Sequence, residues 1–178
     1  GLIADDLTGA FDAAAPFARR GLATRMVCRA DALATALDGP CDMLAVNTAS
    51  RHIESAAAAE RVARVCQALA PLRPALLFKK IDSTLRGNVV AEVAAAMAAS
   101  GRGEAVVTPA MPAQGRTVRG GAVFVNDVPL AETSFAHDQI SAPARQPLAR
   151  QFADAGLRAA VVGGGGPDGD AQVWIADC

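Results

Sequence analysis

The feature that most constrains the fold of this chain is a regular alternation of short apolar runs with longer, alanine-rich stretches of helical spacing. Such alternation is typical of βαβ units, in which a parallel sheet carries helices on both faces. The expected strands cover 2–4, 24–28, 42–46, 75–79 and 104–108, and the expected helices cover 10–20, 31–37, 54–69 and 89–99. The sequence therefore predicts an α/β fold with a mostly parallel sheet flanked by helices on both faces.

The pattern changes after the fifth expected strand. Two runs that favour β-structure, 122–125 and 128–130, are separated by Asn126 and Asp127, and an Asn-Asp pair tolerates the positive φ of a tight turn. This predicts a β-hairpin, followed by a helix around 145–155 and by strands near 159–162 and 172–176. At 178 residues the chain is about one domain long. Both ends lie inside strand-like runs, so we expect residues 1–178 to be one domain of a longer protein.

Charge and cysteine content narrow the functional classes. The 17 basic and 18 acidic side chains give a net charge of −1, which provides no positive surface for nucleic acid or an anionic membrane. No apolar run approaches the roughly 20 residues of a membrane span. Cys28, Cys41, Cys66 and Cys178 have neither CxxC nor zinc-ligand spacing, so no metal site is predicted. We expect them to be buried free thiols of a cytoplasmic protein.

Polar residues gather just after four of the expected strands. Asp5 and Asp6 follow the first strand, and residues 47–51, 80–87 and 109–116 follow the third, fourth and fifth. In an open parallel sheet these loops lie at one edge, the carboxyl ends of the strands, where ligands bind. The sequence therefore predicts a polar ligand site at this edge, with ordinary solvated loops as the alternative.

The residue types in these loops suggest roles. Lys79 and Lys80 are the only lysines beside fifteen arginines, and neighbouring strand residues face opposite sides. Lys80 is expected to point toward a ligand, and an ion pair with Asp82 is the structural alternative. Arg86 and Arg116 offer paired parallel donors that match a carboxylate.

The loop after the first strand combines carboxylates with a helix start. Asp5 and Asp6 are suited to accepting a hydrogen bond from a sugar hydroxyl or to acting as a base. Thr8 is expected to cap the helix that begins near Ala10, which directs a helix N-terminus at the ligand edge.

Several common motifs are excluded. Gly164 to Gly169 matches G-x-G-x-x-G, but it contains a proline and leads into a strand, so a surface turn is predicted there. Neither lysine follows a glycine-rich phosphate-binding loop, and His52 and His137 are isolated. No nucleotide site is therefore expected in this chain. A dinucleotide-dependent oxidoreductase would need glycines directly after the first strand, where Asp5-Asp6-Leu7-Thr8 stands instead.

Taken in order, these clusters resemble the four-carbon acid sugar kinase family. The matching segments are 3–10, 79–88, 109–117 and 128–133, and the stretch KKIDSTLRGN at 79–88 is the most specific. The resemblance covers residues 2–138. It implies a two-domain enzyme with an N-terminal acid-sugar-binding domain, which this chain resembles, and a C-terminal ATP-binding domain. Such enzymes phosphorylate a terminal hydroxyl of a four-carbon acid such as threonate, erythronate or 3-oxo-tetronate.

Phosphoryl transfer requires mainly positioning and charge neutralisation, and the residue types suggest candidate roles in it. The substrate carboxylate is assigned to Arg86 and Arg116, and the substrate hydroxyls to Asp5, Asp6, Asp82 and Ser83. Lys80 is expected to balance charge near the transferred phosphoryl group or the substrate anion. Asp6 or Asp82 is a candidate base, and a base from the C-terminal domain is the equal alternative. ATP and Mg²⁺ are expected to bind mainly in the C-terminal domain. A homo-oligomer is left open, and the alternative function is a non-catalytic module that binds or senses sugar acids.

Overall fold

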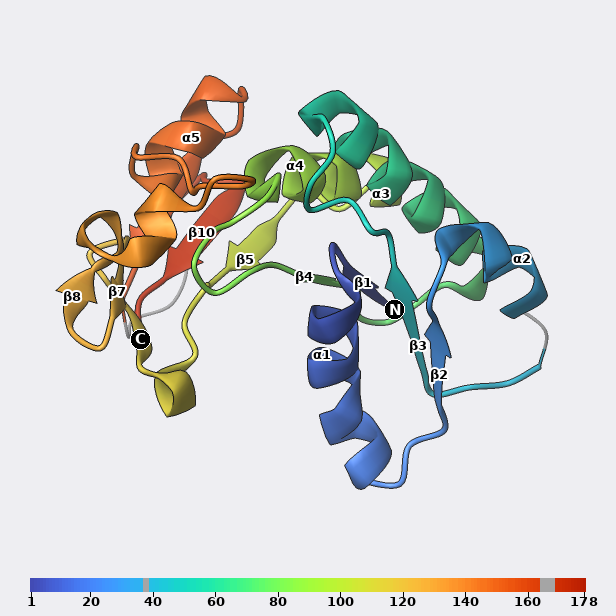
Figure 1. Ribbon diagram of the computed structural model, residues 1–178. Coiled ribbons are helices and arrows are strands. Elements are labelled where there is room, and N and C mark those ends of the chain that lie inside the picture. Colours follow the sequence, from blue (N-terminus) through green and yellow to red (C-terminus); the bar gives the residue numbers. More distant parts are fainter. Residues whose placement is uncertain (37–38, 164–168) are drawn as a thin grey trace.

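The structure is a computed structural model that describes residues 1–36, 39–163 and 169–178 (Figure 1). Its strands are β1 (Leu2–Ala4), β2 (Thr24–Val27), β3 (Met43–Asn47), β4 (Phe78–Lys80), β5 (Ala105–Val107), β6 (Arg116–Arg119), β7 (Ala122–Val125), β8 (Val128–Pro129), β9 (Ala159–Val162) and β10 (Val173–Ala176). Its α-helices are α1 (Leu7–Arg19), α2 (Leu33–Ala36), α3 (Ser55–Leu69), α4 (Val89–Ser100) and α5 (Leu148–Asp154). None of the described helices has both the length and the apolar character that crossing a membrane requires.

A four-stranded parallel sheet in the order β2-β3-β1-β4 forms the first half of the molecule. Figure 1 shows α1 on one face of this sheet and α3 with α4 on the other. Successive strand residues point to opposite faces. Leu2 therefore packs with Ala10 under α1, whereas Ile3 packs with Val62 of α3. The predicted fold class, a parallel sheet with helices on both faces, is confirmed here.

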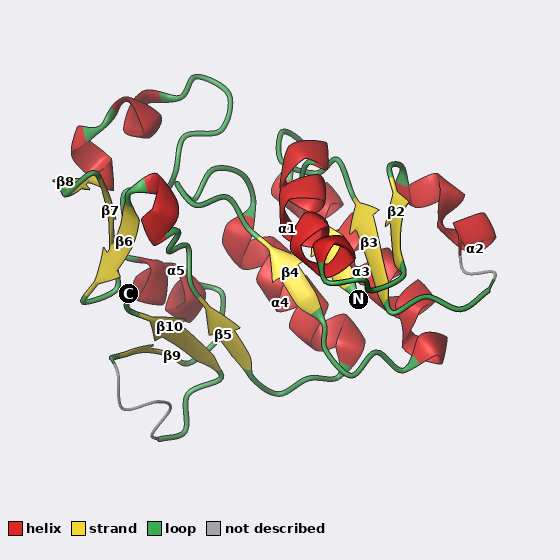
Figure 2. Ribbon diagram, turned by 90° about the horizontal axis from the view of Figure 1, so that it is seen from below, coloured by secondary structure: helices red, strands yellow, loops and turns green. Residues whose placement is uncertain are grey.

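A second parallel sheet, in the order β5-β10-β9, forms the other half. Its buried face packs Val107 and Ile175 against Phe152 of α5 and Met97 of α4. Figure 2 shows β4 and β5 facing each other at the border between the two sheets, but the described strands form no ladder between them. The expected strands are thus divided between two sheets, because β5 pairs with β10.

The hairpin predicted after the fifth strand is confirmed. Strands β7 and β8 pair antiparallel, and the turn residues Asn126 and Asp127 have φ values of 49° and 65°. The sequence did not reveal β6, which pairs with β7 through a turn at Gly120 and Gly121. Arg116 is therefore the first residue of a strand rather than part of a loop.

Two details of the prediction are wrong. Helix α1 begins one turn earlier than expected, and its N-cap is Asp6, whose Oδ1 accepts a hydrogen bond of 2.9 Å from the backbone N of Gly9. Thr8, the expected cap, lies inside the helix because Asp6 already has the extended backbone of an N-cap. Among the cysteines, Cys66 is buried as expected, but Cys28 and Cys178 are exposed.

Two expected features extend beyond the described residues. The helix expected over 31–37 is present as α2 after a short 3₁₀ turn, and its last expected residue, Leu37, lies outside them. Residues 164–168 of the glycine-rich stretch also lie outside them.

Candidate functional site

The candidate site lies at the carboxyl ends of β1, β3 and β4. Strand β1 is internal in its sheet, with β3 on one side and β4 on the other. After β1 the chain forms β2 and β3 on one side of β1, and it then crosses to form β4 on the other side. The loops at this edge therefore separate beside β1. Such a switch point forms a crevice for ligands in open α/β sheets.

Arg51, on the loop after β3, connects the carboxylates of this crevice. Its Nε and Nη2 donate to the two oxygens of Asp5 at 2.7 and 3.1 Å, and its Nη1 donates to Asp6 at 2.9 Å. Asp82 Oδ1 lies 3.9 Å from its Nη2. Burial alone lowers the pKa of Arg51, but the surrounding carboxylates outweigh this and hold the pKa above its ordinary value. The guanidinium therefore stays charged and holds three carboxylates together.

The sequence placed Arg51 in a polar cluster but gave it no role. The charge of the neighbouring residues could have identified Arg51. Three aspartates are expected at one edge of the sheet, and such a group of carboxylates needs a nearby cation. The loop that carries Arg51 is fixed to the segment that follows β1, because the backbone N of Ser50 donates to the carbonyl of Asp5 at 2.9 Å. Ala49, next to Ser50, has a φ of 48°, an uncommon conformation for a residue with a Cβ.

Asp82 and Arg86 form the second charged pair of the site. Arg86 Nε and Nη2 each donate to Asp82 at 3.0 Å, and Thr84 Oγ1 donates to the same carboxylate at 2.5 Å. Burial alone raises the pKa of Asp82, but the hydrogen bonds from Arg86 and Thr84 reverse this and bring the pKa well below its ordinary value. Both oxygens of Asp82 are therefore committed to protein donors.

The two lysines diverge as the strand alternation predicted. Lys79 Nζ pairs with Glu92 of α4 at 2.7 Å, and both side chains are almost fully buried. Lys80 Nζ donates to the carbonyl of Ile81 at 2.6 Å, and no contact with Asp82 occurs in the described part of the chain. Lys80 and Ser83 line a groove of about 510 Å³ between β4 and β5.

Arg116 reaches the site from the other half of the molecule. Its guanidinium carbon lies 5.8 Å from the ring centroid of Phe135, and that of Arg86 lies 5.7 Å from the same centroid. Asp138, three residues after Phe135, brings its Oδ2 to 3.7 Å from Arg86 Nη1. Arg86 and Arg116, the two arginines expected to bind the substrate carboxylate, thus lie beside the same aromatic ring.

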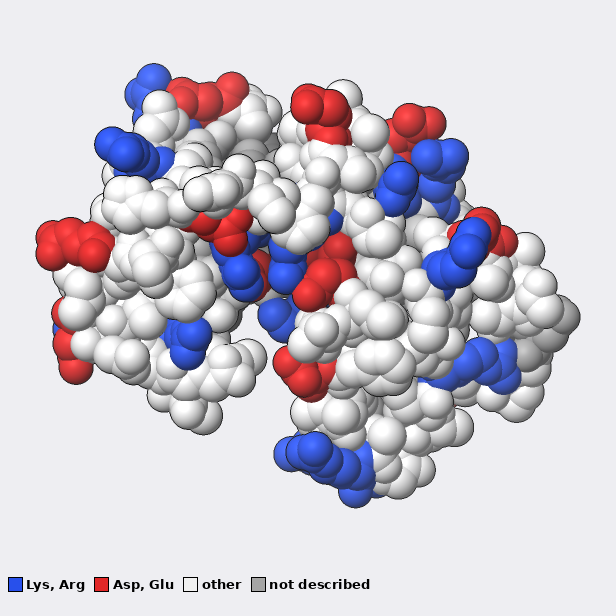
Figure 3. All heavy atoms as spheres, in the orientation of Figure 1, with Lys and Arg blue, Asp and Glu red and all other residues white. Residues whose placement is uncertain are grey.

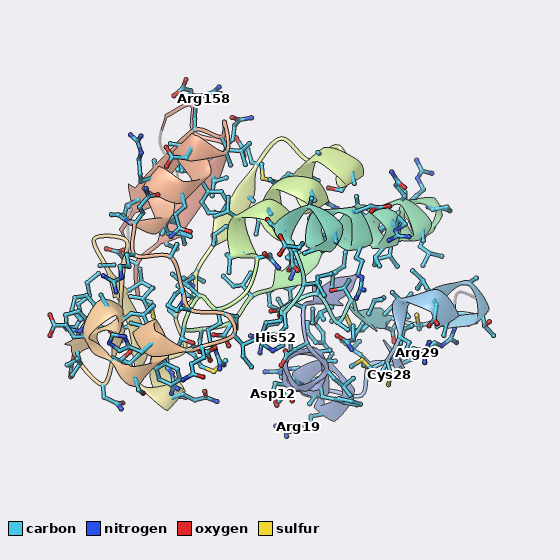
Figure 4. The ribbon with its side chains drawn as sticks, turned by 45° about the horizontal axis from the view of Figure 1, so that its top comes forward. Asp12, Arg19, Cys28, Arg29, His52 and Arg158 are labelled. Carbon is cyan, nitrogen blue, oxygen red and sulfur yellow. The ribbon has the colours of Figure 1, made fainter. Side chains whose placement is uncertain are left out.

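The molecule is hollowed where these groups meet. Figure 3 shows a hollow between α1 and the region of β7 and β8, with acidic and basic side chains gathered at its upper end. In Figure 4, His52 lies between α1 and that region, whereas Cys28 and Arg29 lie on the far side of α1. The predicted site residues therefore gather around two neighbouring features: the charged cluster holds Asp5, Asp6, Asp82, Arg86 and Arg116, and the groove holds Lys80 and Ser83.

This arrangement suits a polyhydroxylated anion better than a resident metal. Carboxylates and hydroxyls accept from sugar hydroxyls, and the two guanidinium groups provide donors for an anion. The oxygens of Asp5 and Asp82 are already engaged by arginines. They do not offer the free oxygen ligands that Mg²⁺ requires. Within the described residues, no group of His, Cys, Asp and Glu side chains is arranged to hold a metal ion.

Comparison with known proteins gives the following relatives. Residues 1–162 match a family described as the sugar-binding N-terminal domain. The chain is 44% identical over 138 residues to a D-threonate kinase of Salmonella typhimurium, covering 77% of this chain and 32% of that protein. It is 36% identical over 138 residues to a D-erythronate kinase of Heliobacterium modesticaldum, covering 77% and 31%. The chain thus spans about a third of the length of the curated relatives that it matches.

A solved structure has the same fold. It is a domain of unknown function from Bordetella bronchiseptica, described as a domain-swapped dimer with bound citrate. The TM-score is 0.86 at 35% sequence identity, and the match covers 100% of this chain and 46% of that one.

Proposed function

The chain belongs to the four-carbon acid sugar kinase family, in which it matches the sugar-binding N-terminal domain, and on this basis we propose that it binds a four-carbon acid sugar for phosphorylation by ATP. Threonate, erythronate and 3-oxo-tetronate are the candidate substrates, and a terminal hydroxyl is the proposed acceptor. The observation that carries the proposal is the joining of Asp5, Asp6 and Asp82 by Arg51 beside Arg86.

The contacts support different roles for the three aspartates. Asp5 is 3% exposed and both of its oxygens accept from Arg51, so its proposed part is to hold the loop and to orient Arg51. Asp82 in the same way orients Arg86. The Asp6 side chain is 27% exposed, which favours Asp6 over Asp82 as the group that accepts the proton of the attacking hydroxyl.

Cationic groups and Ser83 complete the proposed site. The substrate carboxylate is proposed to bind between Arg86 and Arg116, which approach the same ring from two parts of the chain. Ser83 is proposed to contact a hydroxyl, and Lys80, which lines the same groove, to balance the charge near the transferred phosphoryl group.

ATP and Mg²⁺ are proposed to bind mainly in the part of such kinases that lies outside this domain. The curated relatives are about three times as long as the region matched here. When bound, Mg²⁺ would neutralise charge on the nucleotide phosphates. A homo-oligomer is also part of the proposal, since the Bordetella relative is described as a dimer.

The proposal is tested in the full-length protein that contains this chain. We expect ATP-dependent phosphorylation of a four-carbon acid, followed as ADP release, and a fall of the specificity constant by about tenfold or more in Arg86→Lys, because a hydrogen bond to a charged group contributes about 1.5–3 kcal/mol. The matched control is Arg119→Lys, which alters an exposed guanidinium near Phe124.

Two outcomes would contradict the proposal. Binding of the acid without turnover would favour the non-catalytic sensor. An equal loss of activity in Arg86→Lys with threonate and with its uncharged amide would exclude the carboxylate role.

A further inference from the structure

Arg86 has one donor group that the fold leaves unmatched. Its Nε and Nη2 are both committed to Asp82 at 3.0 Å. Its Nη1 has no hydrogen-bond acceptor among the described residues, and the Asp138 oxygen at 3.7 Å lies beyond the usual 2.7–3.2 Å of an N–H···O bond. The Arg86 side chain is 30% exposed, so part of it is open to a ligand.

Asp138 is held in front of Arg86 by its own backbone turn. Its Oδ1 accepts from the backbone N of Ile140 and of Ser141, both at 2.9 Å. This fixes the carboxylate and directs Oδ2 toward Arg86. Hydrogen bonds from Ser141 and Ile140, with smaller contributions from Arg86 and His52, hold the pKa of Asp138 below its ordinary value. Asp138 is therefore an anion at neutral pH.

The surroundings of Asp138 are those of an anion site. Arg86 and Arg116 both lie within 6 Å of the Phe135 ring centroid, at 5.7 and 5.8 Å, so two like charges share one aromatic ring. The Nε of Arg116 is shielded from solvent and has no partner in the described part of the chain. Asp138 places a second carboxylate, besides Asp82, next to Arg86.

We propose that Asp138 is a specificity-determining residue that stands in the place of the substrate carboxylate. In the free protein its Oδ2 occupies the position from which one carboxylate oxygen of the acid sugar binds Arg86 Nη1, and the acid must displace it. The inference rests on the proposed function, because it takes Arg86 and Arg116 as the carboxylate-binding residues. Asp138 thereby weakens the binding of acids, and it prevents anions that bind Arg86 only weakly from occupying the site.

The test compares an acid with its neutral analogue. Asp138→Asn removes the charge but keeps a side-chain oxygen for the backbone turn. Dissociation constants for D-threonate and for its amide are measured by titration calorimetry on the wild-type and variant proteins. Since an exposed ion pair without a hydrogen bond contributes little, we expect threonate to bind only about two- to fivefold more tightly to the variant. Binding of the amide is expected not to change.

The control for net charge is Asp154→Asn, which removes a carboxylate that pairs with Arg150 on α5 at 2.9 Å. This variant is expected to bind both compounds as the wild type does. If Asp138→Asn does not fold, Asp138→Ser replaces it, because a hydroxyl can accept the same backbone hydrogen bonds.

Three results would overturn the inference. Weaker binding of threonate to the variant would mean that Asp138 contacts the substrate directly. An equal gain for the acid and the amide would indicate a simple loosening of the loop, and unchanged binding would indicate a surface residue. If the wild-type protein binds neither compound, the proposed function itself fails, which is a separate outcome.

Discussion

Replacing Arg51 by Met should destabilise the fold far more than the loss of an ordinary surface arginine. Arg51 makes three hydrogen bonds to Asp5 and Asp6, at 2.7, 2.9 and 3.1 Å, and its side chain is 11% exposed. Asp5 is 3% exposed, and within the described residues its carboxylate is hydrogen-bonded by Arg51 alone. Arg51→Met therefore leaves a buried carboxylate without a partner. Breaking a buried ion pair on one side costs about 3–5 kcal/mol.

The size of the effect can be measured in two ways. For a chain of this length, 1 kcal/mol changes the melting temperature by about 2–4 °C, so a decrease of roughly 6–20 °C is expected. Urea unfolding gives the free energy directly, and Trp174 is a convenient probe because it is the only tryptophan and is 3% exposed. Far-UV circular dichroism should follow the same transition if unfolding has two states.

A double-mutant cycle separates the ion pair from other effects of Arg51. Asp5→Asn removes the charge that Arg51→Met leaves buried, so the double variant should be more stable than the sum of the single effects by at least about 1–2 kcal/mol. The matched control is Arg64→Met on α3, where the pair with Glu60 is exposed and 3.8 Å long. It should change stability by less than about 0.5 kcal/mol. A loss below about 1 kcal/mol in Arg51→Met, or strict additivity with Asp5→Asn, would refute the argument.

Two further predictions concern Asp82 and the two lysines. Asp82 has a pKa below its ordinary value of 3.8 in the folded protein, so it contributes stability above that pH and the contribution is lost as the pH falls. The urea midpoint of unfolding, measured from about pH 6 to about pH 3, should therefore fall less steeply with decreasing pH in Asp82→Asn than in wild type. Parallel pH dependences of the two midpoints would contradict a lowered pKa of Asp82. Lys79→Met leaves the buried Glu92 carboxylate without its cation and with only the hydrogen bond from Ser50, and should cost about 3–5 kcal/mol. Lys80→Met is the matched variant at the neighbouring residue. It should change the unfolding free energy little but lower the specificity constant by about tenfold. A large loss of stability in Lys80→Met with a loss of activity alone in Lys79→Met would mean that the roles of the two lysines are exchanged.

The local parts of the fold could be predicted because they depend on nearby residues. Apolar runs and helical spacing identified most elements, and the Asn126-Asp127 turn has the positive φ that its residue types tolerate. The division into two sheets could not be predicted in this way. It depends on β5 pairing with β10, whose residues Val173–Ala176 lie far along the chain, and sequence periodicity does not specify strand partners.

The candidate site was predictable in its position but not in its contacts. Asp5, Asp6 and Asp82 were found because they follow strands, and parallel strands end at one edge. Arg51 was overlooked as a site residue because its importance comes from the carboxylates that surround it in space. Phe135 gave no signal either, since its contact with Arg86 and Arg116 joins distant parts of the chain.

Helix α4 has a consequence for how the molecule unfolds. Its Ala96 packs into the core of the first sheet, whereas Val93 and Met97 pack into the core of the second. No ladder joins β4 to β5 in the described strands, so this helix carries much of the cooperativity between the two halves. Either half can open while α4 stays protected by the other. The amides of α4 should therefore exchange with solvent more slowly than those of β4 and β5, and truncating Met97 should loosen the second half before the first.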